Sequence, residues 1–176
     1  LALPQPWASS VALSCDIIDD LDRRIASVDL ELRRAACDDS RLALLRTIPG
    51  VGPVLAATIA AELGDVTRFP SARQLVGYTG LAPFVMQSGE RDRRGPLTKH
   101  GPRYLRWALI EAATHACRHA AYRRRYLRTR RRLGRQRGPR VARVEVARQL
   151  ATAIWHMLTK GEPFAPPAGP TIYLVA

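Results

Sequence analysis

One segment of the sequence, residues 86–106, reads MQSGERDRRGPLTKHGPRYLR. Glycine and proline interrupt regular structure up to Pro102, after which an apolar-periodic helix is predicted to begin. Ser88 is therefore predicted to lie on an exposed, irregular loop or small hairpin. Three basic side chains follow on or near the helix N-terminus: Lys99, Arg103 and Arg106.

This combination of residue types suits an anionic substrate. A serine hydroxyl can act as a nucleophile, and Arg, Lys and helix N–H groups can neutralise and bind phosphate oxygens. The alternative is a flexible Gly/Ser loop without chemistry, which an isolated Ser-Gly step by itself favours. The local residues alone leave both interpretations open.

The charge of the chain predicts a polyanionic partner. The 176 residues carry 28 Lys and Arg against 15 Asp and Glu, a formal net charge of +13, which favours binding to nucleic acid. The hydrophobic content of 47% is enough for one modest domain with its own core. No apolar run reaches transmembrane length and no signal-peptide pattern opens the chain, so no membrane partner is expected.

The cysteines and histidines give no indication of a metal site. Cys15, Cys37 and Cys117 are widely spaced and form no CxxC pair, so we expect neither zinc nor a disulfide framework, and reduced thiols are consistent with the cytoplasm. His115 and His119 have the spacing of two ligands on one helix face, but no third ligand is evident. Ordinary histidines are the favoured interpretation, and no cofactor is expected in this chain.

The N-terminal part predicts a long helix. Residues 1–10 are typical of a linker or tail, and residues 11–39 of a helix with a heptad seam. The seam consists of Ile18, Leu21, Ile25, Val28 and Leu32. Such a seam can pair with a second chain in a homo-oligomer or pack on its own domain, and the pattern leaves both open.

Residues 40–162 predict an all-α domain that begins with a helix-hairpin-helix motif. A short helix over residues 41–47 and a second helix over residues 53–63 flank the turn Pro49-Gly50-Val51-Gly52. The N–H groups of Gly50 and Gly52 can approach a phosphate closely, beside a helix N-terminus that favours negative charge. The alternative is a plain helical hairpin.

An arginine-rich segment follows, over residues 122–133. Its apolar stripe is thin, and like charges four residues apart destabilise a helix, so the segment is predicted to fray alone and to become ordered on a polyanion. Its candidate contacts to nucleic acid are Arg124, Arg128 and Arg131. A last helix is predicted to restart at Pro139 and to end at Lys160, with a tail over residues 163–176.

Several of these motifs together resemble a known family. They are YTGLAP at residues 78–83, QSG at 87–89 and GPLTKHGPRYLR at 95–106, with IPGVGP at 48–53 and GEPF at 161–164. In this order they resemble the C-terminal transposase domain of the bacterial DEDD-type insertion-sequence transposases, relatives of the Piv-type DNA invertases. The resemblance covers most of residues 40–165.

The resemblance implies a reaction and its partners. Ser88 is similar to the family serine that attacks DNA, and Lys99, Arg103 and Arg106 would stabilise charge on the phosphate. An N-terminal RuvC-like acidic domain that binds Mg²⁺ would complete the site; it is absent from this sequence, which starts with Leu and is interpreted as a fragment. A guide RNA encoded by the element is a further expected partner beside DNA, in the bacterial cytoplasm and at the nucleoid.

Overall fold

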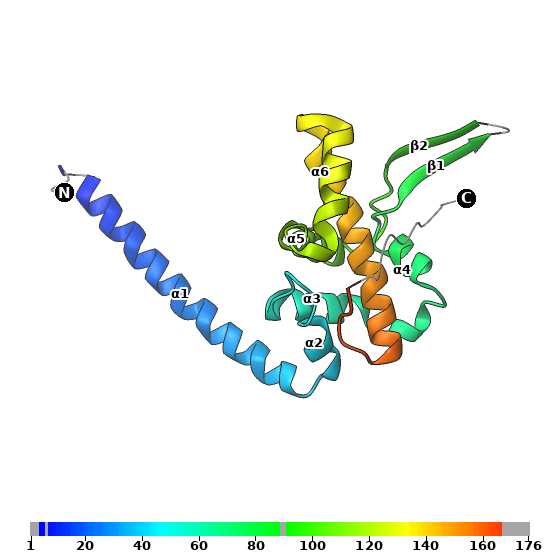
Figure 1. Ribbon diagram of the computed structural model, residues 1–176. Helices are drawn as coiled ribbons and strands as arrows, with labels where there is room; N and C mark the ends of the chain where they lie inside the picture. The colour runs from blue at the N-terminus through cyan, green and yellow to red at the C-terminus, as the bar shows by residue number, and fades with distance from the viewer. Residues whose placement is uncertain (1–3, 6, 89–90, 167–176) are drawn as a thin grey trace. The chain divides into compact units, whose positions relative to one another are not determined.

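The computed structural model describes residues 4–5, 7–88 and 91–166, and most of these residues are helical (Figure 1), which confirms the predicted all-α class. The elements are α1 (Trp7–Cys37), α2 (Ser40–Leu45), α3 (Pro53–Leu63), the 3-10 helix η1 (Val66–Arg68), α4 (Ala72–Tyr78), β1 (Pro83–Ser88), β2 (Arg91–Leu97), α5 (Arg103–Ala116) and α6 (Ala120–Lys160). They form two compact units, Leu1–Asp38 and Asp39–Ala176. None of the described helices is both long and apolar enough to span a lipid bilayer.

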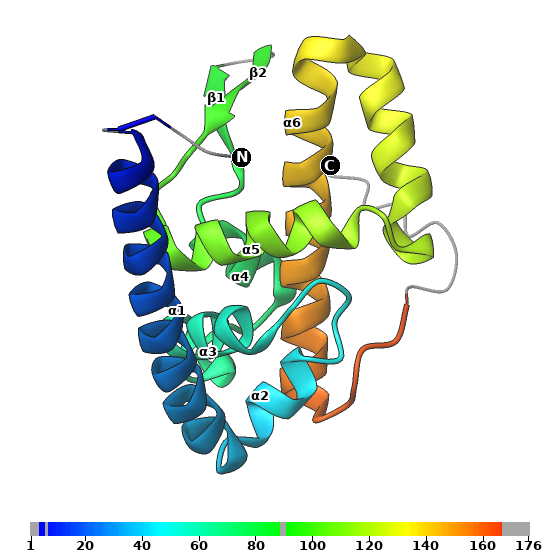
Figure 2. The ribbon, with the colours of Figure 1, turned by 90° about the vertical axis from the view of Figure 1, so that its left-hand side faces the viewer.

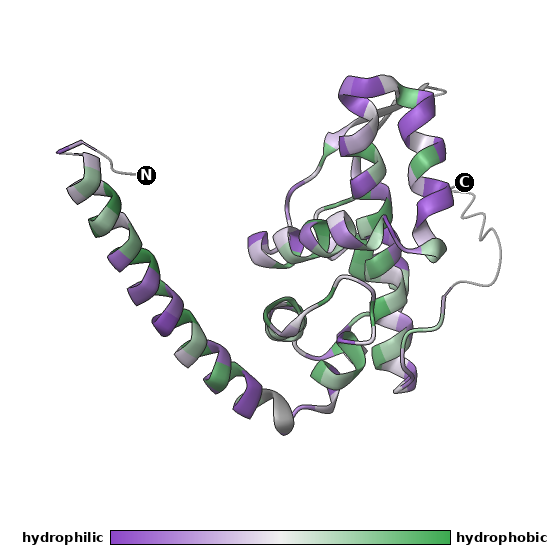
Figure 3. Cartoon of the chain, turned by 60° about the vertical axis from the view of Figure 1, so that its left-hand side comes forward, coloured by the Kyte–Doolittle hydropathy of each residue, from purple (hydrophilic) through white to green (hydrophobic). Residues whose placement is uncertain are grey.

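The first unit is the single helix α1, which begins at Trp7, four residues before the predicted start. The apolar seam runs along one face of this helix, between hydrophilic residues on the others (Figure 3). Ile18, Leu21, Ile25 and Val28 are between 51% and 57% exposed. The seam is therefore an apolar face that the helix does not bury by itself.

The core of the second unit lies where α5 meets α3 and α6, and α4 and α2 also pack on α6 (Figure 2). One stripe of α5 is fully buried, in steps of three and four residues: Leu105, Ala108, Leu109, Ala112, Ala113 and Ala116. The alanine side chains in this stripe are small, so the axes of neighbouring helices can approach closely. Leu150 and Ile154 of α6 are among the side chains that fill the core from the other side.

The turn before α3 packs directly on α5. Gly50 has a φ of +88°, and a Cβ atom there would lie 2.8 Å from both the Ala112 carbonyl oxygen and the His115 Cβ. Gly52, the N-cap of α3, has ordinary extended backbone and no atom near its absent Cβ. Packing and backbone conformation thus require glycine at position 50 but not at position 52.

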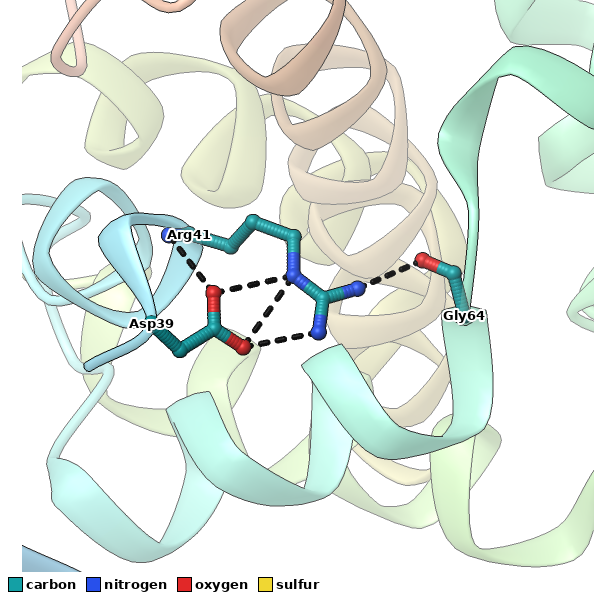
Figure 4. Close-up of polar contacts among 3 residues, drawn as sticks. All are labelled: Asp39, Arg41 and Gly64. Carbon is teal, nitrogen blue, oxygen red and sulfur yellow. Dashed lines mark hydrogen bonds and ion pairs between the residues drawn. The ribbon is translucent and has the colours of Figure 1, made fainter. Parts of the chain in front are cut away.

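An ion pair connects the two ends of this helical hairpin. Asp39 caps α2 by accepting from the Arg41 N–H, and its carboxylate accepts from the Arg41 guanidinium at 2.7 to 3.1 Å. The Arg41 Nη1 atom donates to the Gly64 carbonyl at the end of α3, over 2.8 Å (Figure 4). The side-chain hydrogen bond from Arg41 lowers the pKa of the Asp39 carboxyl below its usual value.

Helix α6 folds back on itself at Gly134, whose φ of 76° and ψ of −178° are not helical. This bend divides it into a first arm (residues 120–133) and a second arm (residues 135–160), which run side by side (Figure 2). The predicted restart at Pro139 is wrong by about five residues, because the bend is at a glycine and Pro139 lies within the second arm. The arms touch at Gly138, where a Cβ would come within 2.4 Å of the Arg130 carbonyl oxygen.

The first arm is held by contacts with other parts of the second unit. The prediction that this arm frays alone is therefore not confirmed. Tyr122 is 1% exposed, and its ring lies 6.1 Å from the ring of Phe164, a residue of the predicted tail. Glu145 of the second arm accepts from Arg125 Nε at 2.8 Å and from the Thr129 hydroxyl. Sequence reasoning missed these contacts because they join residues 16, 20 and 42 positions apart.

We predict different effects of the two turn glycines on stability. Gly50→Ala should lower the free energy of unfolding by about 2–4 kcal/mol, from the left-handed backbone and the overpacking against α5. Gly52→Ser should leave it unchanged or raise it by a few tenths of a kcal/mol, because serine is a good N-cap. Urea unfolding of both variants checks this, and equal costs at the two positions would contradict the packing role of Gly50.

A second prediction concerns the contact between the two arms of α6. Burial raises the pKa of the Glu145 carboxyl, but the hydrogen bonds from Thr129 and Arg125 and the charges of Arg125 and Arg132 outweigh it, so the pKa lies below its usual value. Ionised Glu145 therefore stabilises the folded state at neutral pH, and this contribution is lost as the pH falls through the lowered pKa. Glu145→Gln should cost about 1–3 kcal/mol at pH 7.

The measurement is the free energy of unfolding of parent and Glu145→Gln between pH 7 and pH 3, with the exposed Glu162→Gln as control. The difference between parent and Glu145→Gln should shrink towards acid pH, while Glu162→Gln follows the parent. A difference that is independent of pH would mean that the Glu145 charge does not hold the two arms together.

Candidate active site and nucleic-acid interface

Ser88 is the last residue of β1, at the end of a two-stranded antiparallel hairpin that extends from the helical core (Figure 1). Its Cα pairs with that of Arg91, the first residue of β2. Gly89, the other half of the predicted Ser-Gly step, lies outside the described residues. Of the two predicted possibilities, irregular loop or small hairpin, the structure has the hairpin.

The nearest basic residues on the partner strand are ones that sequence reasoning did not select. Arg93 and Arg94 pair by Cα with Met86 and Val85, and Arg91 pairs with Ser88 itself. The signal was present in the sequence as the run Arg91-Asp92-Arg93-Arg94.

The predicted phosphate-binding residues lie at the other end of the hairpin. Lys99 and Arg103 are exposed, and Arg103 opens α5. At about 3.3 Å per residue, the eight positions from Arg91 to Lys99 separate them from the Ser88 end by about 25 Å. Ser88 and these cations are therefore not brought together at one phosphate in this structure.

The two ends of the hairpin meet in close backbone contact, which we call the hairpin base (residues 78–82 and 98–101). Thr98 N–H donates to the Ala82 carbonyl at 3.0 Å, and Lys99 N–H donates to the Gly80 carbonyl at 3.1 Å. A Cβ on Gly101 would lie 1.9 Å from the Tyr78 carbonyl oxygen. Two of the motifs that carry the family resemblance thus form a single packed junction.

Two arginines donate to carbonyl groups of this base. Arg106 Nη1 donates to the Lys99 and Gly101 carbonyls, both at 3.2 Å. Arg148 Nε of α6 donates to the Leu81 carbonyl at 2.7 Å. Burial lowers the pKa of the Arg148 guanidinium, as expected for a charge drawn from water into a backbone contact. Arg106 therefore has a structural role at the hairpin base. Sequence reasoning did not identify the role of Arg148, because this residue is 67 positions from its partner Leu81.

Lys99 has a left-handed backbone, with a φ of 56°, and among the described residues no other non-glycine has a positive φ. Such a conformation is unfavourable for a side chain with a Cβ and persists only where surrounding contacts impose it. Here the contacts are the hydrogen bonds from the Lys99 N–H to Gly80 and from Arg106 to the Lys99 carbonyl. The backbone of Lys99 is therefore held beside the first turn of α5, and its side chain is exposed.

The two turn glycines Gly50 and Gly52 are exposed, and no hydrogen bond from either N–H occurs among the described residues. Both groups are therefore available to an external acceptor. For Gly50, however, the absence of a side chain is already explained by the contact with α5.

The exposed face of the α6 bend is strongly basic. Arg124, Arg128 and Arg131 are exposed on the first arm, as the predicted role requires. The bend and its surroundings add more exposed arginines: Arg123, Arg130, Arg132, Arg135, Arg137 and Arg140. The only carboxylate between residues 112 and 161 is Glu145, and it is already bound to Arg125 and Thr129.

The two histidines have separate local roles. His115 Nε2 lies 3.6 Å from a Glu111 carboxylate oxygen, and His119 Nδ1 caps α6 by accepting from the Ala121 N–H. In the described part of the chain, no three His, Cys, Asp or Glu side chains are grouped closely enough to hold a metal ion.

Comparison with known proteins finds one matching family model and several similar proteins. Residues 42–128 match the Transposase IS116/IS110/IS902 family. A "Probable family 20 transposase" of Pseudomonas aeruginosa is 30% identical over 168 residues, which cover 93% of this chain and 49% of that protein. A 44.8 kDa protein of insertion element IS116 from Streptomyces clavuligerus is 32% identical, over 88% of this chain and 39% of its own length.

The transposase of insertion sequence element IS1111A from Coxiella burnetii is 31% identical, over 81% of this chain and 40% of that protein. The chain thus spans about half or less of the length of these relatives. The matched region includes the helical hairpin, the hairpin base and the start of the arginine-rich arm. Residues 42–128 thus match the Transposase IS116/IS110/IS902 family, and most of the chain is similar to part of each of these insertion-element proteins.

Proposed function

We propose that this chain takes part in DNA transposition by cutting and rejoining DNA strands, with the Ser88 hydroxyl as nucleophile. The observation that carries the proposal is the position of Ser88 at the far end of a hairpin that projects from a basic domain of a transposase family. A nucleophile on a projecting hairpin can reach a phosphate between the grooves of a duplex without collision with the domain core.

In the proposed reaction, Ser88 Oγ attacks a DNA phosphorus atom, and the bond from phosphorus to one deoxyribose oxygen breaks. The serine hydroxyl gives up its proton to water, the deoxyribose oxygen takes a proton from water and leaves as a hydroxyl group, and the serine is left as a phosphodiester to the other strand end. Attack by a hydroxyl of a second strand reverses these steps. Because the ester conserves the bond energy, rejoining needs no external energy source.

The basic residues bind the DNA backbone at two places in this proposal. Arg91, Arg93 and Arg94 lie on the strand paired with that of Ser88. Lys99, Arg103 and the guanidinium nitrogens of Arg106 other than Nη1 contact phosphates several nucleotides away, beside the hairpin base. Because such contacts recognise phosphate rather than bases, they position the strand without choosing its sequence.

Other parts of the chain bind nucleic acid or a second copy of the chain in this proposal. The N–H groups of Gly50 and Gly52 and the exposed Arg124, Arg128 and Arg131 hold nucleic-acid backbone, either DNA or an element-encoded guide RNA. The α1 seam pairs two copies of the chain, as a heptad seam does in a coiled coil. The work is done on bacterial DNA, at the nucleoid in the cytoplasm.

The Mg²⁺ of this proposal belongs to the acidic domain that the family resemblance implies, because the described residues of this chain contain no group of ligands for it. The steps above are therefore those of this chain's own residues.

A second candidate function is a nucleic-acid-binding module without chemistry. The observation that favours it is the separation of about 25 Å between the Ser88 end of the hairpin and Lys99, estimated from strand geometry. In that case Ser88 would be one more polar residue at the end of a binding hairpin.

We predict that Ser88→Ala abolishes strand exchange and the covalent protein–DNA adduct, while affinity for DNA stays within about twofold, because one neutral hydroxyl contributes little to backbone binding. The measurement traps the adduct in denaturant from the intact protein with DNA of the element ends, and Ser10→Ala on α1 is the matched control. Adduct formation by Ser88→Ala would show that another group is the nucleophile. If neither parent nor control forms an adduct, the binding-module alternative holds.

The arginine-rich arm gives a further prediction. Changing Arg124, Arg128 and Arg131 together to Gln should reduce the slope of log affinity against log salt by about two to three units, because each phosphate contact contributes roughly 0.7 to 0.9. Helicity of the first arm should be the same with and without nucleic acid, since Tyr122 and Glu145 already hold it.

The control changes the same charge elsewhere: Arg23, Arg24 and Arg34 of α1 to Gln. Both triple variants lose three positive charges, so only a contact made by the α6 residues gives them different slopes. Parallel slopes for the two variants would mean that Arg124, Arg128 and Arg131 form a solvated surface.

A further inference from the structure

The outward face of α5 carries two large aromatic side chains in the open. Tyr104 is 62% exposed and Trp107 is 48% exposed. Three positions apart on a helix, they are neighbours on one side. The buried stripe of the same helix, from Leu105 to Ala116, faces the other way and is complete without them.

Basic residues precede this aromatic pair in the chain. Arg103 precedes Tyr104 and is exposed, and Lys99 and His100 are exposed in the segment that leads into the helix. The first acidic residue of α5 is Glu111, one turn beyond Trp107, and its carboxylate lies 3.6 Å from His115. The pair is thus at the basic end of the helix, next to the hairpin base.

These features together fit the bases of a single strand better than an apolar protein surface. Every base presents a flat face that stacks on an aromatic ring, and the cations beside the rings can neutralise the phosphates of the same strand. In a duplex the faces of the bases are covered by the neighbouring base pairs, so they cannot stack on the aromatic rings. An apolar protein surface would leave the neighbouring Lys99 and Arg103 without opposite charges.

We propose that Tyr104 and Trp107 form a stacking platform for unpaired bases of a DNA strand, whose backbone contacts Lys99 and Arg103. The platform rests on the proposed function, because strand exchange separates the strands near the cut. The hairpin is about 20 to 25 Å long by strand geometry, so the stacked bases are several nucleotides from the phosphate at Ser88. The platform holds an opened strand away from its former partner.

The test compares the intact chain with Tyr104→Ala/Trp107→Ala on oligonucleotides of one sequence: single-stranded DNA, duplex DNA and single-stranded RNA. Affinity for single-stranded DNA should fall by about tenfold or more, since base–aromatic stacks are strong and are not replaced by alanine. Affinity for the duplex should change less than about twofold, and the salt slope should stay the same, because no charge is removed.

Two controls keep the comparison specific. Tyr104→Phe/Trp107→Phe keeps an aromatic ring at both positions and should retain most of the affinity for single-stranded DNA. Leu13→Ala shortens an apolar side chain of similar exposure, 62%, on another helix and should have no effect. Circular dichroism checks that each variant is as helical as the parent.

Equal losses on single-stranded and duplex DNA, or no loss on either, would overturn the platform. So would a loss confined to RNA, which would assign the rings to an RNA strand, or a change from dimer to monomer in the alanine variant, which would assign them to a second copy. If Ser88 forms no covalent adduct but the alanine variant loses only single-strand binding, the stacking platform is supported. The proposed serine chemistry alone is then rejected.

Discussion

The close backbone contact between Gly80 and Gly101 determines where the hairpin leaves the domain. A Cβ on Gly101 would overlap the Tyr78 carbonyl, and one on Gly80 would lie 2.8 Å from the Gly101 nitrogen. Because both positions lack side chains, the two segments can approach each other closely. The Lys99 N–H then donates to the Gly80 carbonyl, and the Thr98 N–H donates to the Ala82 carbonyl. The direction of β1, the start of α5 and the position of Lys99 all follow from this junction.

The charges of the second unit have two distinct uses. Inside, Glu145 with Arg125 and Arg148 with Leu81 connect elements far apart in sequence. Outside, the arginines around the α6 bend have no carboxylate among them, so the surface stays positive. Because the first arm is already held on the second, a nucleic acid that binds there pays little of the ordering entropy that a frayed helix would require.

Local signals predicted most of the fold. Pro53 at the start of α3 and the apolar period of α5 gave these helices near their observed bounds. The bend of α6 was misplaced because Pro139 is the stronger breaker in a sequence, whereas the positive φ of Gly134 is imposed by the packing of two arms. Contacts across 16 to 67 residues, such as Thr129–Glu145 and Arg148–Leu81, leave no periodic trace.

The candidate site was predicted in part. Ser88 was expected on a loop or hairpin, but Lys99 and Arg103 were placed beside it because they are close in sequence. An extended strand converts a short sequence separation into a long distance, about 25 Å here, which a helix would have kept much shorter. Tyr104 and Trp107 were overlooked although they fall off the apolar stripe of α5, which is the sequence signal for an exposed aromatic residue.

The most direct test of the hairpin base is amide hydrogen exchange at Thr98 and Lys99, whose N–H groups bond to Ala82 and Gly80. Arg148→Met removes the bond to Leu81, and Arg143→Met, which removes only a bond within α6 to Pro139, is the control. We predict that exchange of both amides becomes about tenfold faster or more in Arg148→Met and is unchanged in Arg143→Met, in line with the loss of a charged hydrogen bond. Unchanged protection in Arg148→Met would contradict the claim that this junction fixes the hairpin to the helical core.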